Sequence, residues 1–114
     1  MKLSEREAPM VCPRTDSYMR LFIFARFHAC AGYEATVAAA LRDVTAATRR
    51  ETGCLAIDAF RSARDPGLFY VHSCWTDEAA FELHAKQPHT LAFLARVEPL
   101  IDHALEVTRT LPLE

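Results

Sequence analysis

The segment from Trp75 to His89 contains the side chains best suited to chemistry in this sequence. It reads W-T-D-E-A-A-F-E-L-H from Trp75 to His84, and Pro88 and His89 follow. Histidine has an ordinary pKa of about 6.5, so a neutral imidazole at pH 7 can accept a proton from an acidic substrate. A tryptophan ring can form a flat wall for an aromatic ligand and can donate its indole N–H. We therefore take His84 as a candidate base and Trp75 as a candidate binding residue.

Each of these side chains also has an ordinary structural interpretation. His84 could connect the end of a helix to the loop before Pro88, and Trp75 could simply fill the core at the end of a strand. His89 follows a proline at a predicted helix start, where we expect an exposed structural role. Three phenylalanines could line the same cavity as Trp75 or belong only to the core: Phe27, Phe69 and Phe81.

Composition excludes several classes of protein. The 114 residues suit one domain, with 51% hydrophobic and 25% charged residues and a net charge of −2. This charge offers no basic field for nucleic acid, and no run of about 18 apolar residues suggests a membrane span. The four cysteines are widely spaced and are expected to be free thiols in the cytoplasm. His72 and Cys74 could begin a zinc site, but further ligands at short spacing are missing, so we expect no metal.

Sequence patterns predict one domain after a flexible extension. Residues 1–18 carry charges and two prolines without a sustained period, so the domain should comprise residues 19–114. Strands are expected at 20–28, 55–62, 68–75 and about 105–111. Helices are expected from about 37 to 51, from 76 to about 86, and from 88 to about 99.

Short motifs predict how these elements begin and end. Gly32 should form a turn, and Gly53 should terminate the first helix as a C-terminal cap. Asp65-Pro66-Gly67 has the composition of a type II turn, in which glycine takes a positive φ. Thr76 should cap the second helix through its hydroxyl.

The resulting order, β-α-β-β-α-α-β, predicts an α+β, ferredoxin-like split β-α-β fold with an antiparallel sheet. Helices can cover only one face of such a sheet. Phe22, Phe24 and Tyr70 would lie on the other face, where leaving large side chains in water forfeits roughly 1.5–3 kcal/mol each. We therefore expect a homodimer in which a second sheet covers this face. Arg26 would lie on the same face and would need a carboxylate partner.

The ordered motifs resemble the antibiotic biosynthesis monooxygenase family. They are A-R-F from Ala25, Gly32, E-T-G-C-L from Glu51, Asp65-Pro66, and W-x-x-x-x-A-F-x-x-H from Trp75 followed by P-H, and the resemblance covers about Met19 to Leu111. The family implies a dimeric α/β barrel with a substrate pocket between the sheet and helices of each subunit. It also implies oxidation of quinols, anthrones or related polyphenols by O2 without a metal or flavin cofactor.

The resemblance also implies roles for individual residues. His84 matches the helix histidine of the family and would be the catalytic base, while Trp75, Ser73, Phe27, Phe81 and Phe69 would bind substrate. Many relatives have glutamate where this chain has Ser73, which disfavours a mechanism that needs a carboxylate there. A related heme-degrading branch uses asparagine, tryptophan and histidine at the positions of Ala25, His84 and Leu94, so heme degradation is disfavoured.

Three functions remain open from the sequence. The first is a cofactor-independent monooxygenase that oxidises a quinol-like or anthrone-like aromatic small molecule with O2. The second is a non-oxidative isomerase or cyclase that uses the same histidine for proton transfer. The third is a dimer, related to stress or small-molecule binding, that has no catalytic activity.

Overall fold

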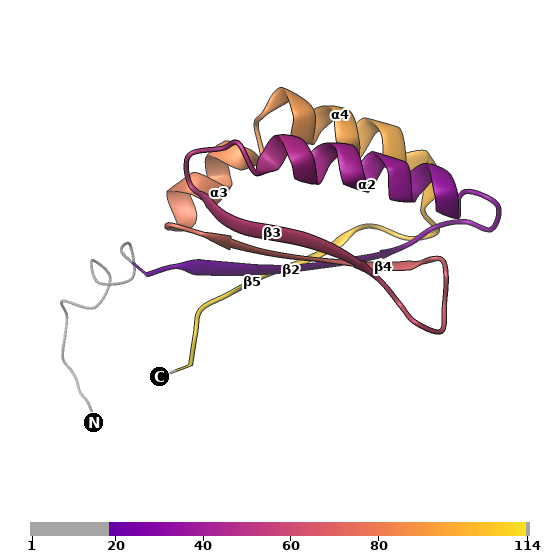
Figure 1. Cartoon of the computed structure of the whole chain (residues 1–114), viewed down its shortest axis with the longest axis horizontal. Helices are drawn as coiled ribbons and strands as arrows, with labels where there is room; N and C mark the ends of the chain where they lie inside the picture. The colour runs from indigo at the N-terminus through magenta and orange to yellow at the C-terminus, as the bar shows by residue number, and fades with distance from the viewer. Residues whose placement is uncertain (1–18, 114) are drawn as a thin grey trace.

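The computed structural model describes residues 19–113 as a four-stranded antiparallel sheet with helices packed on one face (Figure 1). The predicted extension at residues 1–18 lies outside the described residues. The elements are β2 (Leu21–His28), α2 (Glu34–Thr48), β3 (Cys54–Arg61), β4 (Leu68–Trp75), α3 (Glu78–His84), α4 (Pro88–Val97), the 3-10 turn η1 (Glu98–Leu100) and β5 (Glu106–Thr110). This arrangement confirms the predicted α+β ferredoxin-like fold and the predicted element order.

The strand order β3-β4-β2-β5 places β4 and β2 in the middle of the sheet, with β3 and β5 at its edges. β4 pairs with β2 on one side and with β3 on the other, and all three pairings are antiparallel. Ile23 of β2 is opposite Ser73 of β4, and Leu21 is opposite Trp75. This register places Ser73 and Trp75 on the face that the helices cover.

Alternation along β2 separates the two faces of the sheet. Leu21, Ile23 and Phe27 are buried under the helices, whereas Phe24 is exposed on the opposite face. Phe27 belongs to a core cluster with helix residues such as Leu41, and a second cluster joins Leu21 and Ile23 to Trp75. Within residues 19–113, no helix is both long enough and apolar enough to cross a membrane.

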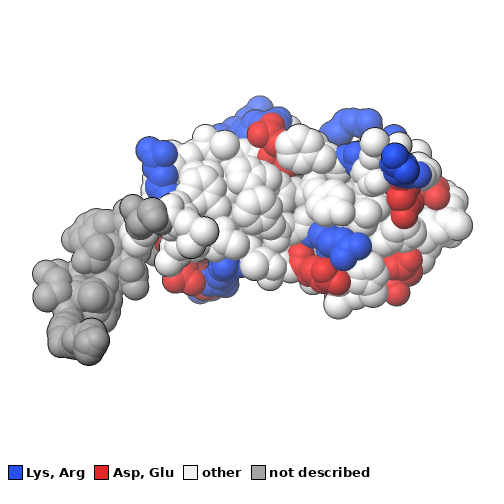
Figure 2. All heavy atoms as spheres, turned by 90° about the horizontal axis from the view of Figure 1, so that it is seen from below, with Lys and Arg blue, Asp and Glu red and all other residues white. Residues whose placement is uncertain are grey.

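The opposite face of the sheet carries large apolar side chains that the described residues leave uncovered. Phe24, Phe60 and Tyr70 are 52%, 55% and 41% exposed. Figure 2 shows this face, where uncharged surface occupies much of the middle. The predicted carboxylate partner of Arg26 is Glu106, at 3.6 Å on the neighbouring strand β5. Arg26 is therefore paired within one subunit.

Two glycine predictions were wrong. Gly32 has a φ of +93° and forms the expected turn, but Gly53 and Gly67 do not have positive φ. α2 ends at Thr48, before Gly53, so Gly53 is not its C-terminal cap. Both glycines instead permit close packing: a Cβ at Gly53 would lie 2.4 Å from Ala80 Cβ, and one at Gly67 would lie 3.1 Å from a nitrogen of His28. The turn at Gly67 is accordingly not type II.

The structure also corrects the start of α3. Asp77, and not Thr76, is the N-cap, because Asp77 Oδ1 accepts a hydrogen bond from Ala80 N at 2.9 Å. α3 ends at His84, two residues earlier than predicted. Pro88 occupies the first turn of α4 as predicted, where the missing N–H of proline costs no helical hydrogen bond.

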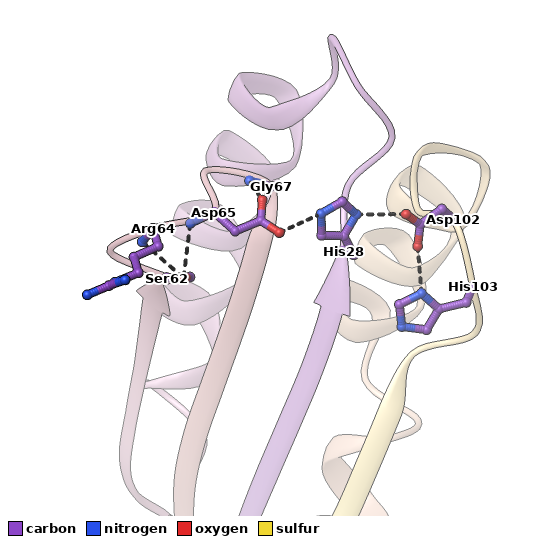
Figure 3. Close-up of polar contacts among 7 residues, drawn as sticks. All are labelled: His28, Ser62, Arg64, Asp65, Gly67, Asp102 and His103. Atoms are coloured by element: carbon purple, nitrogen blue, oxygen red, sulfur yellow. Dashed lines mark hydrogen bonds and ion pairs between the residues drawn. The ribbon is translucent and has the colours of Figure 1, made fainter.

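His28, at the end of β2, joins two loops that lie on either side of it (Figure 3). Its Nδ1 lies 2.7 Å from Asp102 Oδ2, and its Nε2 lies 3.0 Å from Asp65 Oδ2. A carboxylate can only accept, so both contacts are made together by a protonated imidazole. The hydrogen bond to Asp102 is the main cause that raises the pKa of His28. Hydrogen bonds from His103 and then His28 lower the pKa of Asp102.

We expect His28→Gln to lower thermal stability in a pH-dependent manner. Because the pKa of His28 is raised in the fold, its contribution is complete below the ordinary value of about 6.5 and is lost as the pH rises through the raised value. Asp102, whose pKa is lowered, loses its contribution only as the pH falls through that lowered value. Thermal unfolding of both proteins should therefore show a larger difference in Tm at pH 6 than at pH 9. An equal difference at both values would mean that His28 acts only through packing.

Candidate functional site

An apolar cavity of about 300 Å³ lies between the helix-covered face of the sheet and the helices. All four strands contribute to its floor, and α2, α3 and α4 contribute to its walls. Its lining is mostly hydrophobic and includes Leu41, Val71 and Phe93. This size is at the lower end of the range of cavities that bind small organic molecules.

Four of the six predicted site residues line this cavity. Ser73, Phe27, Phe81 and His84 contribute to its surface. They come from β4, β2 and α3, which the antiparallel register brings together.

Trp75 and Phe69 lie outside the cavity lining. Trp75 is fully buried, with its ring centroid 4.7 Å from that of His84 and 5.7 Å from that of Phe81. Its Nε1–H donates to Ser73 Oγ at 2.9 Å, so the indole donor is already used within the protein. Phe69 stacks on Phe27 with ring centroids 5.8 Å apart. Trp75 therefore packs against the rings of His84 and Phe81 without lining the cavity itself.

Glu51 binds the candidate base, a contact that the sequence analysis missed. It lies in the turn between α2 and β3, and its Oε2 is 2.7 Å from His84 Nδ1. The side chains of Glu51 and His84 are only 12% and 14% exposed. The E-T-G-C-L motif contained Glu51, but a contact between residues 33 positions apart cannot be read from local spacing. A partly buried acid is most stable when paired, so this contact fixes both side chains.

His89 completes a group of three around one oxygen. Its Nε2 lies 2.6 Å from the same Glu51 Oε2, with the His89 side chain 26% exposed. Thr90 Oγ1 lies 3.3 Å from His84 Nδ1. His89 is thus partly buried and paired, in contrast to the exposed role that its position after Pro88 suggested.

The contacts determine which nitrogen of His84 can meet a ligand. A carboxylate oxygen accepts hydrogen bonds, so His84 Nδ1 carries the proton that faces Glu51. In the neutral ring, Nε2 is then the unprotonated nitrogen. Because His84 also lines the cavity, Nε2 is the atom available to take a proton from a bound molecule.

Charged groups at the rim hold α3 against the sheet. Arg109 Nη1 on β5 lies 2.7 Å from Glu78 and 2.6 Å from Glu82, both on α3. The hydrogen bonds to Glu82 and Glu78 raise the pKa of Arg109. Its guanidinium also lies 5.1 Å from the centroid of Phe81. Arg109 is therefore paired with acids of its own subunit and lies beside Phe81, which lines the cavity.

Thr48 lies in the cavity wall, but its hydroxyl is buried and is not hydrogen-bonded within residues 19–113. Its side chain is fully buried, and Thr48 Oγ1 has no partner among the described residues. The other buried hydroxyls of the lining are bonded: Thr45 donates to Arg42 O, Ser73 accepts from Trp75, and Thr90 contacts His84 Nδ1. A buried hydroxyl without a partner costs about 1–3 kcal/mol.

Comparison with known proteins identifies the family. The family model for antibiotic biosynthesis monooxygenase matches residues 20–96, which is more than half of the chain. The chain belongs to the antibiotic biosynthesis monooxygenase family. Its sequence is 32% identical over 63 residues to a Bacillus subtilis (strain 168) protein named "Putative monooxygenase YcnE". That match covers 55% of this chain and 66% of the relative's length.

Solved structures show the same fold. The crystal structure of PA3566 from Pseudomonas aeruginosa is 30% identical, with a TM-score of 0.80 over 86% of this chain and 98% of that one. Rv0793 from Mycobacterium tuberculosis is 27% identical, with a TM-score of 0.79 over 83% and 96% of the two chains. Membership in the antibiotic biosynthesis monooxygenase family and the likeness to YcnE support a monooxygenase-like function.

We expect Thr48→Val to raise the free energy of unfolding by about 1 kcal/mol, because it removes a buried hydroxyl that lacks a partner while keeping the side-chain shape. Thr45→Val is the matched control on the same helix, since it removes a hydroxyl that is hydrogen-bonded and should destabilise the protein. Urea unfolding of the two variants measures the difference. Equal destabilisation by both substitutions would show that the Thr48 hydroxyl is hydrogen-bonded in solution.

Proposed function

We propose that this protein is a cofactor-independent monooxygenase that oxidises a quinol-like or anthrone-like aromatic molecule with O2. One observation carries the proposal: a histidine oriented by a carboxylate forms part of the wall of an apolar cavity. Family membership favours oxidation over other uses of such a histidine. A cytoplasmic location, where thiols stay reduced, is supported by the free cysteines Cys30, Cys54 and Cys74.

The first step is removal of a proton from the substrate. His84 Nε2 accepts the proton of a phenol or of the acidic carbon of an anthrone, which leaves an electron-rich anion. Glu51 stabilises the imidazolium that forms, because its carboxylate is hydrogen-bonded to Nδ1 of the same ring. The base and its partner are therefore prepared before substrate binds.

The anion then reacts with O2, which is the oxidant. For an anthrone, the ring methylene loses two hydrogens and gains one oxygen atom, and the second oxygen atom leaves as water. The proton on His84 returns to the oxygen-derived leaving group, so the histidine ends the cycle neutral. The apolar lining favours this sequence, since it keeps water away from the reactive anion and strengthens the interaction of charges inside.

The polar atoms of the cavity suggest how the substrate binds. Only a few polar groups are needed to orient a ligand in a mostly apolar cavity. His84 Nε2 would receive the acidic proton of the substrate. The phenylalanine rings of Phe27 and Phe81 would pack against its aromatic surface.

We expect His84→Ala to reduce oxygen consumption with a hydroquinone or anthrone panel by about 100-fold or more, the usual range for loss of a general base. Glu51→Gln should reduce it by at least about tenfold, because the amide can no longer stabilise the imidazolium. An oxygen electrode gives the rates, and circular dichroism checks that each variant is folded.

His103→Ala is the control for these substitutions, because His103 is an exposed histidine outside the cavity. It should retain the parent rate. Oxygen consumption that His84→Ala leaves unchanged would remove His84 from the mechanism.

An isomerase or cyclase remains the second candidate, because the pair of Glu51 and His84 is equally suited to moving a proton without oxidation. Oxygen distinguishes the two functions. Turnover of a polyketide-like substrate that continues under argon would select the isomerase or cyclase, whereas the monooxygenase requires O2 in proportion to product.

We also propose that two copies pair through the exposed face of the sheet. Phe24, Phe60 and Tyr70 together form an apolar surface, and a second sheet would remove it from water. Such pairing would produce the dimeric α/β barrel that the family resemblance implies. The cavity lies on the other face, within each subunit.

Phe60→Asp should convert the proposed dimer to a monomer, because it places a charge within the paired apolar surface. Light scattering coupled to size-exclusion chromatography measures the mass directly. Leu91→Asp is the control, since Leu91 is equally exposed, at 54%, but lies on α4 in the helical layer. A monomeric parent protein at micromolar concentration would refute the pairing.

A further inference from the structure

Three potential metal ligands converge where three chain segments meet. Glu51 lies in the turn after α2, His84 is the last residue of α3, and His89 lies in the first turn of α4. One ligand atom from each lies within 4.8 Å of the others, and no other group of this kind occurs within residues 19–113. The chain returns to one point from positions up to 38 residues apart.

The donor set suits a divalent transition metal. Two imidazoles and one carboxylate hold such ions in many proteins and leave further coordination positions open. The site would carry one negative charge from Glu51 and two neutral rings, so a divalent cation would be only partly neutralised. The side chains are 12% to 26% exposed, which limits competition from water while leaving a path for entry.

Two of the three distances between ligand atoms can be compared with those of a metal site. Glu51 Oε2 lies 2.7 Å from His84 Nδ1 and 2.6 Å from His89 Nε2, which are hydrogen-bond distances. With metal bonds of about 2.1 Å, neighbouring ligands are about 3.0 Å apart in an octahedral site and about 3.4 Å apart in a tetrahedral site. The two contacts to Glu51 would open by only a few tenths of an ångström around an octahedral ion, and the two histidine nitrogens lie within 4.8 Å of each other.

Protons can rearrange to admit the ion without leaving the rings. In the hydrogen-bonded state, Nδ1 of His84 and Nε2 of His89 carry protons toward Glu51. A metal ion takes the place of those protons, and each neutral ring keeps one proton on its other nitrogen. For His84 that other nitrogen is Nε2, the atom proposed above as the base.

We propose that Glu51, His84 and His89 form a 2-His-1-carboxylate site for a divalent transition-metal ion. Binding would inhibit the monooxygenase reaction, because a proton on His84 Nε2 prevents this atom from acting as the base. The inhibition rests on the proposed function, whereas the binding does not. The cluster is thus a point at which the cation and the substrate proton compete for one imidazole.

A second group of histidines and acids provides the structural contrast. His28 lies between Asp65 and Asp102, which contact opposite nitrogens of its ring (Figure 3). His103 contacts the other oxygen of Asp102. These side chains form a row and do not surround one point, so we expect no comparable affinity there.

Trp75 offers a direct signal for occupancy. It is the only tryptophan of the chain, and its ring centroid lies 4.7 Å from that of His84. A paramagnetic ion such as Ni²⁺ or Co²⁺ bound to His84 should therefore quench its fluorescence. Zn²⁺ should bind the same site with little quenching and should protect it from quenching by Ni²⁺.

The experiment titrates the full chain, freed of metal with a chelator, with Ni²⁺ and Zn²⁺ by calorimetry and by Trp75 fluorescence. We expect one ion per chain, and at least tenfold weaker binding in His89→Ala and in Glu51→Gln. His103→Ala is the control and should bind within twofold of the parent. Two ligand variants are used so that a folding defect in one does not decide the result.

Several outcomes would overturn the proposal. These are no binding up to about 1 mM, binding that His89→Ala and Glu51→Gln leave unchanged, or binding that His103→Ala abolishes. If no metal binds, Glu51, His84 and His89 are connected only by hydrogen bonds. Oxygen consumption is then measured with and without Zn²⁺: binding without inhibition refutes the competition at His84, and binding in a protein without oxygenase activity refutes only the proposed function.

Discussion

The arrangement of the helices depends on one carboxylate. Glu51 Oε2 receives contacts from His84 at the end of α3 and from His89 at the start of α4, while the backbone of Glu51 follows α2 directly. A partly buried carboxylate without partners is strongly unfavourable, so the contacts are mutually dependent. They join the ends of three helices at one corner, and these helices contribute the walls of the cavity. The position of the candidate base is thus determined by the contacts that hold these helix ends together.

Close packing at the same corner supports this constraint. Gly53, two residues after Glu51, lies against Ala80 of α3, where a Cβ would approach Ala80 Cβ to 2.4 Å. Trp75 fills the space beneath His84 and Phe81, and its indole N–H is bonded to Ser73. The turn that contains Glu51 can therefore approach α3 only because Gly53, the residue that packs against Ala80, has no side chain. The close approach at Gly53, the packing of Trp75 and the contact with Glu51 together fix the position of His84.

Local sequence patterns predicted the helices and strands, but they did not predict contacts between residues far apart in the sequence. The order of strands and helices follows from alternation and helical spacing, and the proximity of Trp75 to His84 follows from their positions on either side of one joint. Gly53 and Gly67 were misassigned because their neighbours, Ala80 and His28, come from other segments. The contact of Glu51 with His84 was missed for the same reason: tertiary packing creates it, and nothing in the motif around Glu51 indicates its partner.

The same contact supplies a carboxylate to the proposed base although Ser73 stands where the family resemblance implies glutamate. A glutamate at that position would place a negative charge on the floor of the cavity, opposite Ile23 and Ile57 in the sheet. Ser73 is neutral and bonded to Trp75, so the floor stays uncharged. Glu51 instead contacts His84 through Nδ1 and does not line the cavity. In the proposed reaction, the imidazolium formed at His84 would lie between the substrate anion and the Glu51 carboxylate, and both charges would stabilise it. An acid placed behind the base would stabilise this proton transfer without repelling the anion that is proposed to react with O2.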